Sequence, residues 1–184
     1  MGFTYLNGEN WLDVTREERL FCSHLYQDII GKEKGFILWL NENKKFDLKA
    51  SDDWEVGYEV CFYRDLLKLR KESINSTDYS SKRTFDLCLF SENAIVIIEA
   101  KVQQMFNESQ IKVFEKDRHD IRRITGKNIE VLVVALASSK YFDNYNRYGK
   151  HNILAKFDAR ITWEEMYDLY KNEIYLKAKG KYKN

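Results

Sequence analysis

Proline is absent from this 184-residue sequence. Glycine- or serine-rich linkers, internal repeats and low-complexity tracts are missing as well, so no domain boundary is visible. A chain of this length is long enough for one domain with a substantial core and short for two. The sequence therefore predicts a single domain over residues 1–184.

Cysteine and histidine are scarce, with three of each. Cys22, Cys61 and Cys88 are widely spaced among apolar residues, and their odd number argues against a disulfide framework. Neither a Cys-x-x-Cys nor a His-x-x-x-His pair is present, which excludes the usual ligand spacing of structural zinc. We expect the cysteines to be small buried apolar residues in a reducing compartment.

Long apolar runs and a strong net charge are also missing. The longest runs, 94–98 and 131–137, fall far short of the roughly 20 residues that span a bilayer. Because the first residues lack the pattern of a signal peptide, we expect a cytoplasmic protein with no membrane partner. The net charge is only +1, so a global basic surface for nucleic acid is absent. The lysine-rich segment 177–184 is expected to be a solvated, frayed basic tail.

Hydrophobic periodicity predicts an α/β domain with a mixed central β-sheet flanked by helices. Apolar residues recur at helical spacing from Val14 to Ile29, and Thr15 with Glu18 has the pattern of a capping box. The valine-rich run 129–138 is typical of a strand buried on both faces. Helices are expected over 14–30, 34–43, 107–126 and 163–177, and strands over 84–90, 94–102, 129–138 and 153–162. Loops are expected over 72–82 and 141–152. The segment 54–71 is ambiguous between strand and helix.

Charged residues interrupt the two apolar strands on either side of residues 92–93. If these two residues form the turn, Asp86 lies directly opposite Glu99, with Cβ atoms roughly 5 Å apart. Lys101 then lies on the same face. Carboxylates this close repel each other unless one takes up a proton or a cation lies between them. Mg²⁺ or Mn²⁺ is the natural occupant, and such a site suits phosphodiester hydrolysis with Lys101 assisting a water. A structural ion pair of Lys101 with either acid is the alternative.

Further polar residues are candidates for the same site. Glu18 lies inside the apolar stripe of its helix, where an acid is rare unless it is paired or bound to a metal. It is either a third acid of the site or only a capping-box residue, and Glu59 is its rival if 55–63 forms a strand. Gln110, near the start of the helix over 107–126, either bonds a carboxylate or phosphate or is simply exposed. The same helix has a basic side, either solvated or in contact with phosphate, made of Lys112, Lys116, Arg118, Arg122 and Arg123.

Asp86, then Glu99-Ala100-Lys101, then a helix that carries Gln110 resemble the PD-(D/E)xK nuclease superfamily, which includes many restriction endonucleases. The resemblance covers about residues 83–118 closely. It departs from the family pattern at the proline of the motif, because phenylalanine precedes Asp86 here.

The resemblance implies a restriction-endonuclease-like core and a metal-dependent nuclease that hydrolyses phosphodiester bonds in DNA. Asp86, Glu99 and the Ala100 carbonyl would bind Mg²⁺ or Mn²⁺, and Lys101 would position the attacking water. The implied catalytic residues are Glu18, Asp86, Glu99, Lys101 and Gln110.

Without a third acid, the same pattern fits a catalytically inactive nuclease-fold module that binds nucleic acid or a protein partner. The sequence leaves open whether the protein is an exonuclease or an endonuclease, and whether it is a monomer or a homodimer.

Overall fold

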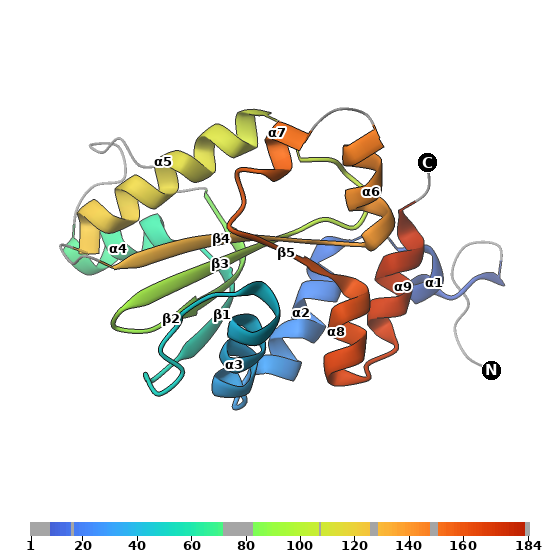
Figure 1. Cartoon of the computed structure of the whole chain (residues 1–184), viewed down its shortest axis with the longest axis horizontal. Coiled ribbons are helices and arrows are strands. Elements are labelled where there is room, and N and C mark those ends of the chain that lie inside the picture. The colour runs from blue at the N-terminus through green and yellow to red at the C-terminus, as the bar shows by residue number, and fades with distance from the viewer. Residues whose placement is uncertain are drawn as a thin grey trace.

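The computed structural model describes residues 8–15, 17–71, 83–106, 108–125, 129–147 and 151–182. Its centre is a five-stranded mixed sheet, which confirms the predicted α/β class (Figure 1). Strands β1 to β3 form an antiparallel meander, and β4 and β5 continue the sheet parallel to β3. In the order in which they lie across the sheet, the strands are β1 (Glu55–Val60), β2 (Phe85–Phe90), β3 (Ala94–Ala100), β4 (Glu130–Ala137) and β5 (Ala159–Thr162).

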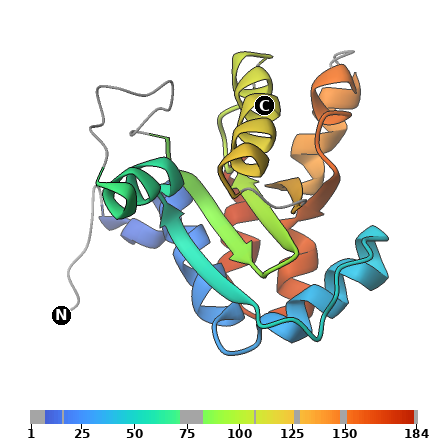
Figure 2. The same ribbon diagram turned by 90° about the vertical axis from the view of Figure 1, so that its left-hand side faces the viewer.

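Helices cover both faces of the sheet, and a view turned by 90° shows the same two helical layers (Figures 1 and 2). Each layer encloses its own apolar core against the sheet. The first face carries α2 (Glu18–Ile29), α3 (Glu33–Lys44), α8 (Trp163–Tyr170) and α9 (Ile174–Lys181). The second face carries α4 (Phe62–Arg70), α5 (Glu108–Thr125), α6 (Ser139–Arg147) and α7 (His151–Leu154).

Most predicted elements are confirmed within a few residues. Residues 131–137 are all buried, as expected of a strand covered on both faces. The helix predicted over 14–30 begins later than expected, at Glu18. Val14, the first residue of the predicted apolar stripe, is instead the last residue of the short α1 (Trp11–Val14) and is 39% exposed. The ambiguous segment 54–71 is a strand followed by a helix. The predicted loop 72–82 lies outside the described residues.

Three predicted elements in the C-terminal half are wrong. The strand predicted over 153–162 is reduced to β5 (Ala159–Thr162), because Ile153 and Leu154 belong to α7 instead. The expected loop 141–152 contains most of α6 and the start of α7, because Tyr141 and Phe142 are buried against the sheet and their packing outweighs the turn-forming asparagines nearby. The expected helix 163–177 is divided at Lys171, which has a left-handed backbone with φ of 56°.

The lysine-rich C-terminal segment is not a frayed tail where it is described. Lys177 forms an ion pair with Asp13, and Lys181 donates to the carbonyl oxygens of Leu12 and Asp13. Tyr182 is buried. The apolar residues of α9 therefore hold the segment against the domain, and Lys177 and Lys181 bind α1 rather than only solvent.

Cys22 and Cys88 are buried, as predicted, and all three cysteines are free thiols. Cys61 is half-buried. Among the helices in the described ranges, none has both the length and the apolar character needed to cross a membrane.

Candidate active site

The hairpin of β2 and β3 has the predicted register. Leu87 pairs with Ile98, as a two-residue turn at 92–93 requires. Continued by one residue, the same register sets Asp86 opposite Glu99. The hairpin therefore brings the two acids of the motif to its open end, where the pairing between β2 and β3 ends.

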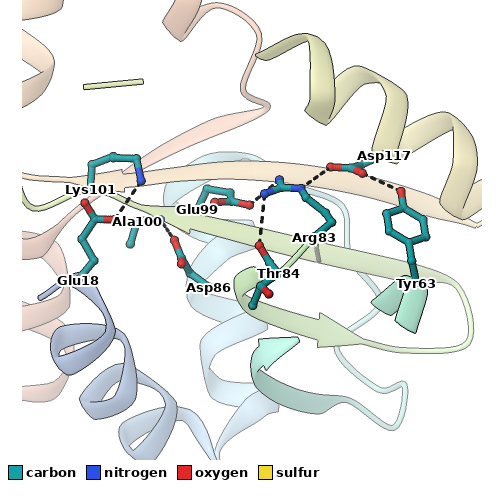
Figure 3. A network of polar contacts seen from close by, with 9 residues as sticks. All are labelled: Glu18, Tyr63, Arg83, Thr84, Asp86, Glu99, Ala100, Lys101 and Asp117. Atoms are coloured by element: carbon teal, nitrogen blue, oxygen red, sulfur yellow. Dashed lines mark hydrogen bonds and ion pairs between the residues drawn. The ribbon is translucent and has the colours of Figure 1, made fainter. Parts of the chain in front are cut away.

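The side chains of β2 do not alternate regularly at Asp86. Leu87 packs on the face covered by α2, whereas Phe85, two residues earlier, packs on the face covered by α5. Residues two apart in a regular strand share a face, so the strand turns over at Asp86. The Asp86 carboxylate accepts a hydrogen bond from the backbone N–H of Ala100, with Oδ2 at 2.8 Å from the nitrogen. Asp86 thus caps the end of β3 and does not point the same way as Glu99 (Figure 3).

The edge strand β1 turns over at the neighbouring position. Tyr58 packs on the α2 face and Val60 on the opposite face. Glu59 between them has φ of 51°, a left-handed conformation that costs about 1–3 kcal/mol in a residue other than glycine. The turnover also explains Gly57, because a Cβ there would lie 2.6 Å from Val60 Cγ2. One strained backbone position therefore lies beside Asp86.

Glu18 reaches the hairpin from α2. Its Oε2 lies 2.9 Å from Lys101 Nζ (Figure 3). The expected capping box is not formed, because Thr15 accepts instead from the backbone N–H of Glu17 and α2 begins without a side-chain cap. Burial raises the pKa of Glu18, and its ion pair with Lys101 only partly offsets this effect. Of the two predicted alternatives, Glu18 is the acid that contacts Lys101.

Lys101 is held by its backbone and by its side chain. Its N–H donates to the Leu136 carbonyl at 2.7 Å, and the Trp163 indole N–H donates to its carbonyl at 3.2 Å. Nζ lies 5.4 Å from the centre of the Phe106 ring. Burial lowers the pKa of Lys101, but the neighbouring carboxyl groups of Glu18, Asp86 and Glu99 together outweigh this and the net shift is upward. Lys101 is therefore an ammonium ion at neutral pH.

A polar pocket of about 600 Å³ opens beside these residues. Both candidate third acids line it, although Glu59 also forms an ion pair with Arg19 at 3.3 Å. Two glutamines of the segment after β3 complete the rim and were not singled out by the sequence. The lining residues are Glu17, Glu18, Arg19, Glu59, Thr84, Asp86, Gln103 and Gln104.

Arg83 is the charged residue of the site that the sequence analysis missed. Its Nη2 lies 2.8 Å from Glu99 Oε1, and its Nε lies 3.0 Å from Asp117 Oδ2 on α5. The guanidinium carbon lies 4.6 Å and 5.0 Å from the ring centres of Phe85 and Phe114. Burial alone would lower the pKa of Arg83, and the two carboxylates outweigh it and raise the pKa. The arginine therefore bridges two acids, and its guanidinium group also makes cation–π contacts with two aromatic rings.

Asp117 extends this network to α4, because the Tyr63 hydroxyl donates to its Oδ1 at 2.7 Å (Figure 3). Asp117 is 3% exposed and lies between Phe114 and Ile121 on the buried stripe of α5. An acid inside an apolar stripe is the same sequence pattern that singled out Glu18, so this pattern could have revealed Asp117. Its partner Arg83 has no comparable sequence pattern.

The acids of the motif are difficult to ionise where they lie. Burial, followed by repulsion from Asp86, raises the pKa of Glu99 to about 8 even though Arg83 pairs with it. Burial also raises the pKa of Asp86, against the effect of its hydrogen bond from Ala100. Together with Glu18, three carboxyl groups within one cluster therefore have raised pKa values, the pattern expected where a cation would be stabilising.

Gln110 and the basic residues of α5 lie apart from this cluster. Gln110 lines a second pocket of about 250 Å³, together with Arg83 and Phe114, and not the pocket that contains Glu18. Several of the basic residues are engaged in ion pairs, for example Lys116 with Asp120 at 2.8 Å. The structure thus brings together Glu18, Asp86, Glu99 and Lys101 and places Gln110 one pocket away.

The residues present fit a hydrated Mg²⁺ better than a protein-enclosed metal centre. Within the described ranges, no group of three or more His, Cys, Asp or Glu side chains is arranged to hold a metal ion. Mg²⁺ does not require such a group, since it keeps several waters and commonly binds one or two carboxylates together with substrate phosphates. The hydrogen bonds above engage one oxygen each of Asp86 and Glu99, so these two hard-oxygen donors suit that mode of binding.

Fold and site together define an α/β protein with a charged, strained cluster at the open end of a β-hairpin. Comparisons of the chain with protein-family models, with curated proteins and with solved structures found no significant match. Its function is therefore inferred from the chemistry of this cluster.

Proposed function

We propose that this protein is a metal-dependent DNA nuclease with a restriction-endonuclease-like core. The observation that supports this most is the meeting of Glu18 from α2 with the hairpin residues Asp86, Glu99 and Lys101, because these are the residues that the family resemblance implies. The strand, turn, strand and helix around them also follow in the expected order.

Asp86 and Glu99 would hold Mg²⁺ or Mn²⁺, with the Ala100 carbonyl as a further ligand. When bound, the ion would supply positive charge that stabilises the phosphate during hydrolysis. The raised pKa values of both carboxyl groups support this assignment, because a bound cation would relieve the repulsion and desolvation that raise them. Arg83 would orient Glu99 from the opposite side.

Lys101 would act as a fixed ammonium ion. Its backbone is anchored on both sides, and Glu18 holds its Nζ at 2.9 Å. From there it would donate a hydrogen bond to the attacking water or to a phosphate oxygen and stabilise the developing negative charge. Gln110, one pocket away beside Arg83, would contact the DNA outside the reacting phosphate.

A catalytically inactive module that binds nucleic acid or a protein partner is the second candidate. It is favoured by the two ion pairs, Lys101 with Glu18 and Arg83 with Glu99, which partly neutralise the cluster without a metal ion. Such a module predicts salt-sensitive DNA binding, with a slope of about one log unit per phosphate contacted, that is unchanged in Asp86→Asn.

Cleavage assays test the enzymatic proposal. Single-stranded, duplex and branched DNA are incubated with the protein and Mg²⁺ or Mn²⁺, and Glu99→Gln and Lys101→Ala are compared with wild type. We expect at least one DNA form to be cleaved, and both variants to lose about 100-fold or more of the rate. Glu130→Gln is the matched control, since this exposed residue begins β4 beside Ala94, at the other end of β3. Equal background in all proteins on all three DNA forms would refute the proposal.

A further inference from the structure

We propose that Arg83 is a built-in cation that occupies the place of a second metal ion, so that the site binds one divalent ion per chain. This inference rests on the proposed function, because it takes Asp86 and Glu99 as metal ligands. Its test counts bound ions and does not require DNA cleavage, so the two proposals can fail separately.

Glu99 lies between two possible cation positions. On one side is Asp86, the second carboxylate of the motif, which the register of the hairpin sets opposite Glu99. On the other side is Asp117, and there the guanidinium of Arg83 contacts Glu99 Oε1 at 2.8 Å and Asp117 Oδ2 at 3.0 Å. One cation shared by two carboxylates is the arrangement that a metal ion produces in a two-metal site. Arg83 therefore fills the second position with a charge from the chain itself.

The arginine is too well held to be exchanged for an ion from solution. Besides its two ion pairs, it donates from Nη1 to the Thr84 carbonyl at 3.2 Å. Phe85 and Phe114 lie beside the guanidinium, and its side chain is only 20% exposed. Displacing it would break bonds at all three guanidinium nitrogens at once.

Removing this charge should create a second ion site. A neutral side chain at position 83 leaves Glu99 and Asp117 without the cation between them, next to the hydroxyl of Tyr63. Two carboxylates and water are a ligand set that Mg²⁺ or Mn²⁺ accepts. Arg83→Met keeps an unbranched side chain that reaches about as far as the arginine Nε, so it removes the charge and retains part of the packing beside the two rings.

Counting bound Mn²⁺ tests the proposal. Metal-free protein is titrated with Mn²⁺, and the free ion is measured by electron paramagnetic resonance. We expect one Mn²⁺ per chain in wild type, none in Asp86→Asn, and two in Arg83→Met. Arg83→Lys, which retains a charge, should bind one, and Arg83→Met combined with Asp117→Asn should return to one because the second site has lost a ligand.

The outcomes separate the two proposals. A wild-type protein that binds no Mn²⁺ at millimolar concentration refutes the metal site and, with it, the proposed function. One ion in both wild type and Arg83→Met, or two in wild type, overturns only the role of Arg83. Circular dichroism shows whether each variant is folded, and if Arg83→Met does not fold, the same count is made on Arg83→Gln with the same expectation of two.

Discussion

Replacing Glu99 by glutamine should stabilise the metal-free protein at neutral and alkaline pH. Glu99 is 6% exposed and its pKa is raised to about 8, so its charged form is unfavourable in the folded state. Glutamine has nearly the same shape, retains an oxygen that can accept from Arg83, and carries no charge at any pH. The variant therefore isolates the effect of the buried charge.

The size of the effect follows from the difference in pKa between the two states. Below about pH 4.5 the carboxyl is protonated in both the folded and the unfolded chain, so it does not affect stability. Between about 4.5 and about 8 the unfolded chain releases the proton while the folded chain retains it, and wild type loses about 1.4 kcal/mol of unfolding free energy per pH unit. Above about pH 8 the loss is complete. Glu99→Gln lacks this loss, so its advantage should grow by about 4 kcal/mol from about pH 5 to about pH 8.

Urea unfolding in the presence of a chelator measures this difference at several pH values. Asp86 and Glu18, whose pKa values are also raised, are present in both proteins, so most of their effect cancels in the difference. Addition of Mg²⁺ should then stabilise wild type, by about 2.7 kcal/mol at 100 times the dissociation constant, and leave the variant unchanged. A difference that stays flat with pH, or a variant less stable than wild type at pH 8, would refute the reasoning. Glu130→Gln serves as the exposed control.

Three further predictions concern stability. Lys101→Met should lower the unfolding free energy at pH 7 by about 3 kcal/mol, because it leaves Glu18 partly buried without its cation; urea titration checks this, and unchanged stability would contradict the role of the pair. Gly57→Ala should lower the unfolding free energy by about 1–3 kcal/mol, because the new Cβ would lie 2.6 Å from a methyl group of Val60. Gly180→Ala, in α9 with no atom within 4 Å of the new Cβ, should raise it by about 0.5–1 kcal/mol, and effects of the same sign would count against this account. Glu59→Gly should melt at a higher temperature than Glu59→Ala and be about 1 kcal/mol more stable, since only glycine adopts a φ of 51° without strain; equal melting temperatures would exclude strain at this position.

The hairpin was predictable because its determinants are local. A two-residue turn fixes the register of both strands, and a period of two then fixes which residues can meet across them. Asp86, Glu99 and Lys101 could therefore be placed together from fewer than 20 residues of sequence. The helix and the buried strand that follow were predictable for a similar reason, since each has a clear apolar pattern.

Long-range pairing and local irregularity were not predictable. Arg83 and Asp117 are 34 residues apart, and only the packing of α5 on the sheet brings them together. The turnover of β2 at Asp86 breaks the regular alternation that the prediction assumed, so the two acids share an end of the hairpin but bond to different partners. From the sequence alone, Lys177 and Lys181 of α9 are expected to belong to a solvated tail, because their acceptors lie on α1, more than 160 residues away.

Arg19, the residue that follows Glu18 on α2, connects this helix to β1. Its side chain pairs with Glu59, and its carbonyl accepts from the Tyr58 hydroxyl at 2.9 Å. Two consecutive residues of β1 thus hold the first turn of a helix that has no side-chain cap of its own. These contacts hold the first turn of α2 where Glu18 meets Lys101, so Glu59 contributes to the position of the helix, and Glu18 is the acid that pairs with the lysine. The strained backbone of Glu59 follows from the same requirement, because the turnover of β1 at this residue lets Tyr58 and Glu59 reach Arg19 together.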